Sequence, residues 1–246
     1  MKWIFLSIVF WFSVGLQGQD STVYGRHLLF GIGVAPSIGI GDFGDKYKSF
    51  SSIPVTATYK TNKNVTFGLT GSGYFGQNIL VPGIFKGMTY DDMLVDINGN
   101  PAAVRFQMRG WYAMATVGKI FSLKRPNLNK GIHLRFGAGF MQHKLRMQFD
   151  SEKVPQLEDA YIKGYDQLHN GLILMTSVQY HLISLRNLSL FAGIDYGHGF
   201  TKNRRSWEYS LNRRDDALKT DQYVSFNAGI IIPLKIYKST EARYFE

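Results

Sequence analysis

Apolar residues alternate with small or polar residues along most of the chain. The clearest case is the stretch 224–237, in which Val224, Phe226 and Ile230 belong to one wholly apolar face. A period of two is typical of strands whose two faces meet different surroundings. Applied along the chain, this pattern predicts eight strands, over residues 28–35, 53–60, 65–75, 111–121, 132–141, 171–182, 188–197 and 224–237.

The connections between these predicted strands are short and long by turns. Those over 61–64 and 184–187 are short, and 122–130 is of moderate length. The others are long, at about 38–52, 76–107, 142–170 and 201–221. An even number of strands, brief turns on one side and longer loops on the other are typical of outer-membrane barrels. We therefore predict an all-β fold, an eight-stranded antiparallel up-and-down transmembrane β-barrel with long external loops.

The amino-terminal segment is typical of a secretory signal peptide. Lys2 precedes an apolar run over residues 3–16, and a short polar stretch follows it. The run is shorter than the about 20 residues that a spanning helix needs, although a retained membrane anchor is the alternative interpretation. We predict a cleaved signal peptide over 1–18, a barrel over 19–246, and location in the outer membrane of a Gram-negative cell. The chain has no cysteine, which excludes disulfides, thiolate metal sites and a lipoprotein anchor.

Charged and polar residues on the predicted inward face point to a sealed lumen. The interior of an eight-stranded barrel is just wide enough for side chains to fill it, and buried charges must pair or draw in water. We therefore predict a structural lumen network in place of a conducting pore. Its expected members are Lys60, His133, Arg135, His181 and Asp195.

Three stretches carry a family resemblance: HLLFGIGV over 27–34, SFNAGIIIPLKIY over 225–237 and the closing KSTEARYFE. With them the chain resembles small eight-stranded outer-membrane barrels, the class of the OmpA membrane domain and OmpX. More narrowly, it is similar to the PorT-like outer-membrane barrel families of Bacteroidota. The resemblance implies an integral barrel that carries no added globular domain.

The last long loop mixes cations, anions and aromatic residues. Arginine forks bind phosphates, such as those of lipopolysaccharide, and arginine with aromatic residues commonly anchors protein partners. A solvated loop that balances its own charges is the alternative. The candidate binding residues are Arg204, Arg205, Trp207, Arg213 and Arg214.

Two motif matches do not support a cofactor or a metal site. The stretch 39–44 fits the dinucleotide pattern G-x-G-x-x-G, but no helix is predicted after Gly44, so a flexible loop is expected. Asp91, Asp92 and the stretch 96–100 lack the spacing of an EF-hand loop and leave only a weak loop-bound cation open. We predict no cofactor and no structural or catalytic metal.

Three classes of function remain, and they differ in where the chemistry would lie. The first is a non-enzymatic structural or interaction subunit, accessory to a secretion or assembly complex. The second is a lipid-modifying enzyme, for which His198, Ser206 and Glu208 are the only candidates, without a suitable spacing. The third is a soluble carrier of the lipocalin type. We favour the first.

The expected partners follow from the expected location. They are outer-membrane lipid and lipopolysaccharide, together with other outer-membrane or secretion proteins. Nucleic acid is excluded by this location, although the formal net charge is +10 at pH 7. Neither the residue types nor their spacing identifies a particular partner.

Overall fold

The structure is a computed structural model that describes residues 26–89, 93–123, 130–150, 154–157, 159–183 and 188–235. The predicted signal peptide and the stretch 236–246 lie outside the described residues. Eight long strands make up most of the described part: β1 (His27–Ile40), β2 (Tyr47–Lys60), β3 (Val65–Ile79), β6 (Val104–Ser122), β7 (Lys130–Phe149), β8 (His169–Leu182), β9 (Ser189–Asn203) and β10 (Lys219–Lys235).

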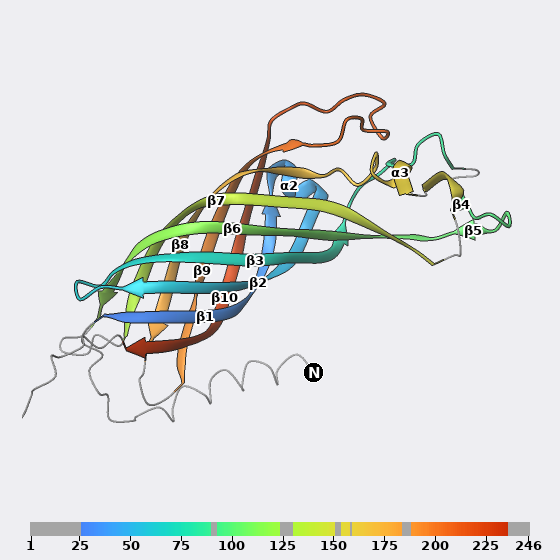
Figure 1. The fold of residues 1–246 in the computed structure, drawn as a ribbon. Helices are drawn as coiled ribbons and strands as arrows, with labels where there is room; N and C mark the ends of the chain where they lie inside the picture. The colour runs from blue at the N-terminus through green and yellow to red at the C-terminus, as the bar shows by residue number, and fades with distance from the viewer. Residues whose placement is uncertain are drawn as a thin grey trace, which may run out of the picture.

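These eight strands form one closed ring (Figure 1), in which strands that follow one another along the chain pair antiparallel. Strand β1 closes the ring by pairing with β10, for example through Ile32 opposite Ile230. The remaining strands, β4 (Leu94–Val95) and β5 (Pro101–Ala102), form a separate small sheet between β3 and β6. The prediction of an all-β, eight-stranded antiparallel up-and-down barrel is therefore confirmed.

Helices are short and lie in the connections. They are α2 (Gly41–Lys46), the 3-10 turn η1 (Pro155–Leu157) and α3 (Asp159–Ile162). In the described ranges, no helix has the length and apolar character needed to cross a membrane. Helix α2 occupies the stretch for which a flexible loop was expected, and that expectation is wrong. Gly41, with φ of 59°, begins this helix, and β2 starts directly after it.

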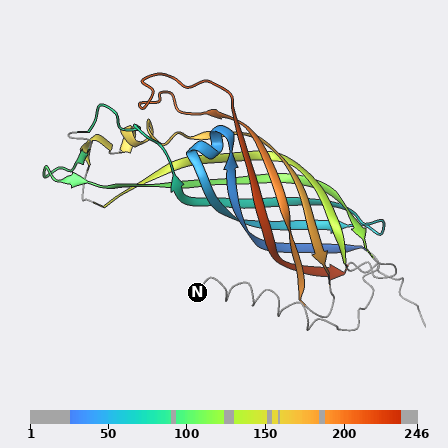
Figure 2. The same ribbon diagram turned by 180° about the vertical axis from the view of Figure 1, so that it is seen from behind.

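The long connections gather at one end of the barrel, where Figures 1 and 2 show β4, β5 and α3 beyond the strand ends. At the other end, the β2–β3 turn is tight, and the Thr61 amide donates to the Val65 carbonyl at 2.9 Å. The long connections are shorter than predicted. Instead of 38–52, 76–107, 142–170 and 201–221, the segments between barrel strands are 41–46, 80–103, 150–168 and 204–218.

The outward face of the barrel is apolar over most of its height, as the alternation predicts. Large side chains there stay exposed: Ile32 at 52%, Leu69 at 67% and Phe136 at 57%. Their neighbours along the strands point inward and are buried or glycine, which gives the burial pattern its period of two. The apolar set therefore lies outside the ring.

Strand β7 shows why the strand ends were misplaced. From Ile132 to Phe140 its outward residues are apolar, but beyond Phe140 they are Gln142, Lys144, Arg146 and Gln148. Over the same stretch the inward residues become apolar, with Leu145 and Met147 buried. The period of two continues while the polarity of the two faces is exchanged. A search for one apolar face therefore ends the strand too early.

The lumen is filled in layers. Inward residues of β7 run from His133 and Arg135 through Met141 to His143, and all four are buried. Around Met141 the filling is aromatic and methionine-rich, and the Tyr74 and Tyr223 hydroxyls hydrogen-bond at 2.7 Å across it. Other members of this layer are Phe43, Tyr47, Phe50, Met108, Tyr112, Met114, Ile173 and Met175.

The seam between β1 and β10 is packed by a side chain from the next strand. Gly33 lies opposite Gly229, and Phe191 of β9 reaches both. A Cβ at Gly229 would lie 2.2 Å from the Ile32 carbonyl oxygen and 2.8 Å from the Phe191 ring. The seam therefore has no room for a side chain at this position.

We expect Gly229→Val to destabilise the barrel by about 1–3 kcal/mol, because overpacking a filled interior costs that much. Urea unfolding in detergent micelles measures the change. Ala228→Val on the outward face is the matched control and should unfold like the wild type. Equal stability of the two variants would contradict this description of the seam.

Candidate functional site

The long connections at one end of the barrel (Figure 1) form a packed layer above the lumen, which we call the head. Its core consists of Ile84 and Leu94 from the β3–β6 connection and Leu157 and Tyr165 from the β7–β8 connection, all buried. They pack in one cluster with Leu145 and other inward residues of the extended strands. The head is thus continuous with the lumen filling and is held in a defined position.

A cleft opens in the head between the β7–β8 connection and the β9–β10 connection. It has a volume of about 340 Å³. Three of its residues, Arg204, Arg205 and Trp207, belong to the predicted loop patch. The other lining residues are Lys163, Gly164, Ser206 and Tyr209. Three cations and two aromatic side chains therefore surround one opening.

Arg205 fixes one wall of the cleft. Its Nε donates to Oδ1 of Asp166 at 2.7 Å, and its Nη2 donates to the other carboxylate oxygen. Asp166 is buried at 6% exposure, so this paired, two-point contact is protected from solvent. The hydrogen bond to Asp166 raises the pKa of the Arg205 guanidinium above its usual value. Arg205 is therefore a structural cation that joins the two connections.

Arg204 and Trp207 are the more accessible members of the cleft. Arg204 is exposed, and its Nε donates to Oδ1 of Asn170 on β8. Trp207 is 44% exposed. Both are available to contact a partner at the opening of the cleft.

Tyr209 is the second aromatic residue that lines the cleft. Its ring packs so closely on Gly164 that a Cβ there would lie 1.9 Å from it. The ring centroid of Tyr165 is 5.3 Å away, and that of Tyr161 is 6.1 Å away. Glycine at position 164 is thus what lets the two connections meet.

Glu208 organises the β9–β10 connection from inside. Its carboxylate accepts hydrogen bonds from Asn203 at 2.9 Å, Ser210 at 2.6 Å and Gln167 at 3.1 Å. It is only 1% exposed. Its backbone pairs with that of Arg213, which turns the loop back on itself. The carboxylate is therefore occupied by structural hydrogen bonds.

The structure separates the other two predicted patch residues from the cleft. Arg213 and Arg214 are both exposed on the far side of the turn. Arg214 pairs with Asp216 at 2.7 Å, with both side chains about two-thirds exposed. Such an exposed pair contributes little to stability. The five predicted residues thus divide into three that line the cleft and two that do not.

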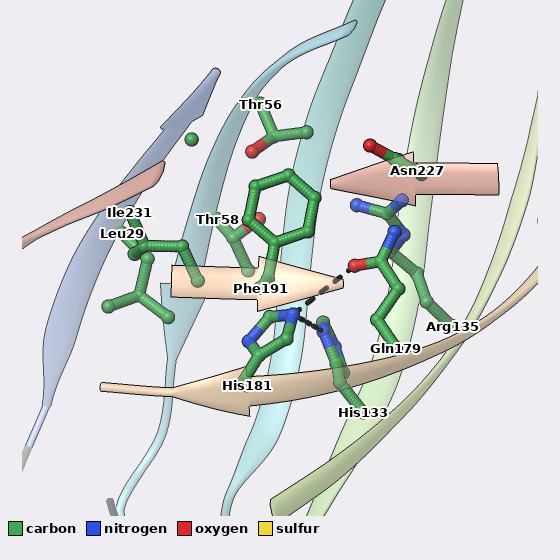
Figure 3. Close-up of a pocket in the computed structure, with 11 residues that line it drawn as sticks. Leu29, Thr56, Thr58, His133, Arg135, Gln179, His181, Phe191, Asn227 and Ile231 are labelled. Atoms are coloured by element: carbon green, nitrogen blue, oxygen red, sulfur yellow. Dashed lines mark hydrogen bonds between the residues drawn. The ribbon is translucent and has the colours of Figure 1, made fainter. Parts of the chain in front are cut away.

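The predicted lumen residues lie inside the barrel in the half away from the head. Figure 3 shows His133, Arg135 and His181 around one small cavity there. His133 and His181 are 3.3 Å apart, and His181 reaches Gln179 at 3.2 Å. Gln179 in turn donates to Asp195 at 3.2 Å. The cavity has a volume of about 20 Å³, close to the room that one water molecule needs.

Arg135 and Lys60 take other places in the lumen. Arg135 donates to the Ser177 hydroxyl at 3.4 Å. Lys60 is 1% exposed and has no hydrogen-bond contact with the His133–Asp195 cluster among the described residues. Asn227, which was not predicted, donates to Asp195 at 2.8 Å. The cluster therefore joins His133, His181 and Asp195 through Gln179.

The lumen holds a second polar cluster near the head, which the sequence analysis did not predict. The Asp221 carboxylate accepts hydrogen bonds from Thr201 at 2.6 Å and from His143 at 2.9 Å, and Tyr47 lies 3.4 Å from the other nitrogen of His143. All four side chains are buried. Each lies in or at the edge of a range predicted as a loop. Continuing the period of two through the change of polarity would have identified them as inward residues.

The candidate enzyme residues are not assembled. His198 points outward, where its ring lies 4.6 Å from that of Phe200 and 3.5 Å from the Tyr196 hydroxyl. Glu208 has the structural partners given above, and Ser206 lies in the cleft. No described contact joins His198 to Ser206 or Glu208. The geometry therefore offers no nucleophile–base pair at this place.

In the acidic β4–β5 turn, the Asp96 carboxylate accepts its hydrogen bonds from within the turn itself. Asp96 accepts hydrogen bonds from the backbone amides of Asn100 and Asn98, each at 2.8 Å. These hydrogen bonds, that from Asn100 first, lower the pKa of Asp96. Asp91 and Asp92 lie outside the described residues. In the part of the chain that the structure describes, no group of three or more histidine, aspartate or glutamate residues is placed to hold a metal ion.

The fold defines the class as a closed eight-stranded antiparallel barrel. Comparisons with solved structures found several similar chains. The chain is similar to Neisserial surface protein A, with 13% identity, coverage of 87% of this chain and 99% of that chain, and a TM-score of 0.45. It is also similar to Ail, the attachment invasion locus protein of Yersinia pestis, with 12% identity, coverage of 85% and 100%, and a TM-score of 0.41.

A third similar structure is the outer membrane protein OprG from Pseudomonas aeruginosa, with 10% identity, coverage of 89% and 99%, and a TM-score of 0.38. No family model matches the sequence. No curated protein sequence is significantly similar to it.

We expect Asp166→Asn to make the β9–β10 connection more mobile while the barrel stays folded. The substitution removes the negative charge that pairs with Arg205. Loss of a charge-assisted pair of about 1.5–3 kcal/mol should speed tryptic cleavage at Arg213 and Arg214 about tenfold or more. Limited proteolysis followed by mass spectrometry measures this rate. Asp150→Asn, which removes the partner of the exposed Arg105, is the control. Unchanged cleavage in Asp166→Asn would refute the role of this pair.

Proposed function

We propose that this protein spans the outer membrane as a closed barrel and acts through the ordered head as a non-enzymatic interaction subunit. The observation that carries the proposal is the exchange of polarity along β6 and β7. From Trp111 to Val117 on β6 and from Phe140 to Ile132 on β7 the outward residues are apolar, and on the head side of this stretch they include Arg109, Lys144 and Arg146. An apolar band edged by aromatic residues, with charges beyond it, matches a bilayer and its polar boundary.

The filled lumen argues against two other functions. Aromatic, methionine and hydrogen-bonded polar layers occupy the interior, and the cavity among His133, Arg135 and His181 is about 20 Å³. A cavity of about 400 Å³ at the head end is lined mostly by polar and charged side chains. A conducting pore needs a continuous open path, and a carrier needs an apolar cavity of about 300–1,000 Å³. A soluble carrier would also turn its apolar face inward, whereas Ile194 and Phe226 are more than half exposed. The barrel therefore serves to hold the head at the membrane surface.

The head supplies the surface for a protein partner. Arg204, Trp207 and Tyr209 surround a cleft whose walls are held by Arg205 and Glu208. Arginine and aromatic side chains in a fixed, partly desolvated setting are typical of binding hot spots. The resemblance to PorT-like barrels supports a role beside a larger secretion or assembly machine. The lack of an accessible nucleophile–base pair at His198 supports a non-enzymatic role.

A cation on the apolar band tests the membrane placement. Ile194→Arg should cost about 2–4 kcal/mol near the bilayer midplane and reduce assembly. Gln142→Arg, outward on the polar side of Phe140, should assemble like the wild type. Heat-dependent gel mobility of outer-membrane fractions measures folded barrel. Recovery of wild type in the soluble fraction, or normal assembly of Ile194→Arg, would overturn this placement.

Substitution in the cleft tests the head. Trp207→Ala with Arg204→Gln should weaken capture of a protein partner about 30-fold or more, as loss of a hot spot of about 2 kcal/mol implies. The measurement is quantitative mass spectrometry of proteins that co-purify after mild detergent extraction. The control double variant, Arg213→Gln with Arg214→Gln, also changes two side chains of this loop, but outside the cleft. It should retain the partner. Equal capture by both double variants contradicts a role for the cleft.

A further inference from the structure

The outer wall of the barrel carries a groove that the proposed function does not use. Its volume is about 820 Å³, and it crosses the outward face from β10 over β1 and β2 to β3 and β6. Residues from all five strands line it, including Ile38, Ser51, Phe75, Arg109 and Phe226. The groove therefore lies on the surface that faces lipid if the barrel spans a membrane.

Strand register explains the shape of the groove. Ser51 of β2 lies between Pro36 of β1 and Phe75 of β3, and Ser49 lies opposite Ile38. Two small side chains thus form a low floor, with larger side chains on both sides. The wall on the β1 and β10 side is apolar, which suits an acyl chain.

The floor is polar in a way that a plain lipid-facing wall is not. Ser49 and Ser51 place hydroxyl groups among apolar neighbours, and the Asn78 amide donates to the Ser49 hydroxyl at 3.1 Å. The pairing of β2 with β3 is also irregular here, with register shifts on both sides of Ser49. Such bulges disrupt the hydrogen-bond ladder, and unpaired polar groups facing lipid are costly. This end of the groove therefore favours a ligand that brings polar atoms.

Arg109 supplies a positive charge at one edge of the groove. It lies opposite Phe75, two residues beyond Trp111 on the same outward face of β6. At about 3.3 Å per residue and a strand tilt of about 35–45°, this places it about 5 Å above Trp111. The Trp111 and Phe140 rings are 5.7 Å apart and mark the aromatic edge of the apolar band. Arg109 is thus at the height of lipid headgroups.

The Arg109 side chain is held in place without an acidic partner. Its Nη2 donates to the Gln107 side-chain oxygen at 2.6 Å, and its Nη1 donates to the Met108 carbonyl at 3.0 Å. Among the described residues, no carboxylate forms an ion pair with it. By contrast, Arg105 pairs with Asp150 at 3.1 Å, and Lys144 lies 4.0 Å from Asp166. Arg109 is therefore positioned to receive an anion.

We infer that this groove binds one phosphate-bearing lipid of the surrounding leaflet, with the phosphate at Arg109 and an acyl chain along the apolar wall. Charge complementarity at headgroup height, continuous with an apolar groove, identifies a lipid as the occupant. The hydroxyl groups of Ser49 and Ser51 hydrogen-bond to the polar part of the lipid between these two ends. The inference rests on the membrane placement proposed above and adds a ligand that the head does not bind.

Native mass spectrometry of the full-length mature protein tests this site. The protein is reconstituted into vesicles that contain dioleoyl phosphatidylglycerol and then extracted into mild detergent. The wild type should retain one phosphatidylglycerol. Arg109→Gln should reduce retention about tenfold or more, because it removes a charge-assisted hydrogen bond. Ser51→Leu fills the floor and should reduce retention while leaving Arg109 intact.

Three controls separate the possible outcomes. Arg105→Gln removes a cation from the same face farther from Trp111 and should retain the lipid. Dioleoylglycerol, which has the same chains without phosphate, should not be retained, and inorganic phosphate should not displace the lipid. Full retention by both groove variants, retention of dioleoylglycerol, or displacement by inorganic phosphate would overturn the inference. Folded wild type in the vesicles without retained lipid overturns this inference alone, whereas failure to enter vesicles overturns the proposed function.

Discussion

The closed ring of backbone hydrogen bonds is the constraint on which the other features depend. Once β1 pairs with β10, the sheet has no edge, and every strand has one face inside the ring and one outside. The period of two then assigns each residue to lumen or surroundings. The interior of eight strands is just wide enough for the inward side chains to fill it, so the other large apolar side chains lie outside and form the apolar band. Closure therefore determines both the apolar band and the sealed lumen.

Much of this could be read from the sequence, because the signal depends on local alternation. Residues such as Ile32, Ile194 and Phe226 were placed correctly outside on that basis. The strand ends could not be placed, since beyond Phe140 the same strand exchanges its polar and apolar faces. The aromatic and methionine layer around Met141 was also missed. Its members come from many strands, and each stands alone in its own stretch of sequence.

The candidate site shows the same limit. Arg204, Arg205 and Trp207 are close in sequence, so a patch over this stretch was predictable. Lys163 and Gly164 join them only because Asp166 binds Arg205 and because Tyr209 packs on Gly164. These contacts link two connections that are distant in sequence, and nothing in either stretch encodes the pairing. The groove at Ser49 and Ser51 likewise depends on strand register and not on a motif.

The packing of Phe191 at the seam bears on how the barrel folds. The ring is completed by joining the first and last barrel strands, so its closure carries the largest entropic cost of any strand pairing. Phe191 can lie over Gly33 and Gly229 only after these two glycines have come together. Interactions that form after the rate-limiting step slow unfolding and leave the folding rate little changed. If closure of the ring limits the rate of folding, the Phe191 ring at the seam is expected to slow unfolding of the assembled barrel.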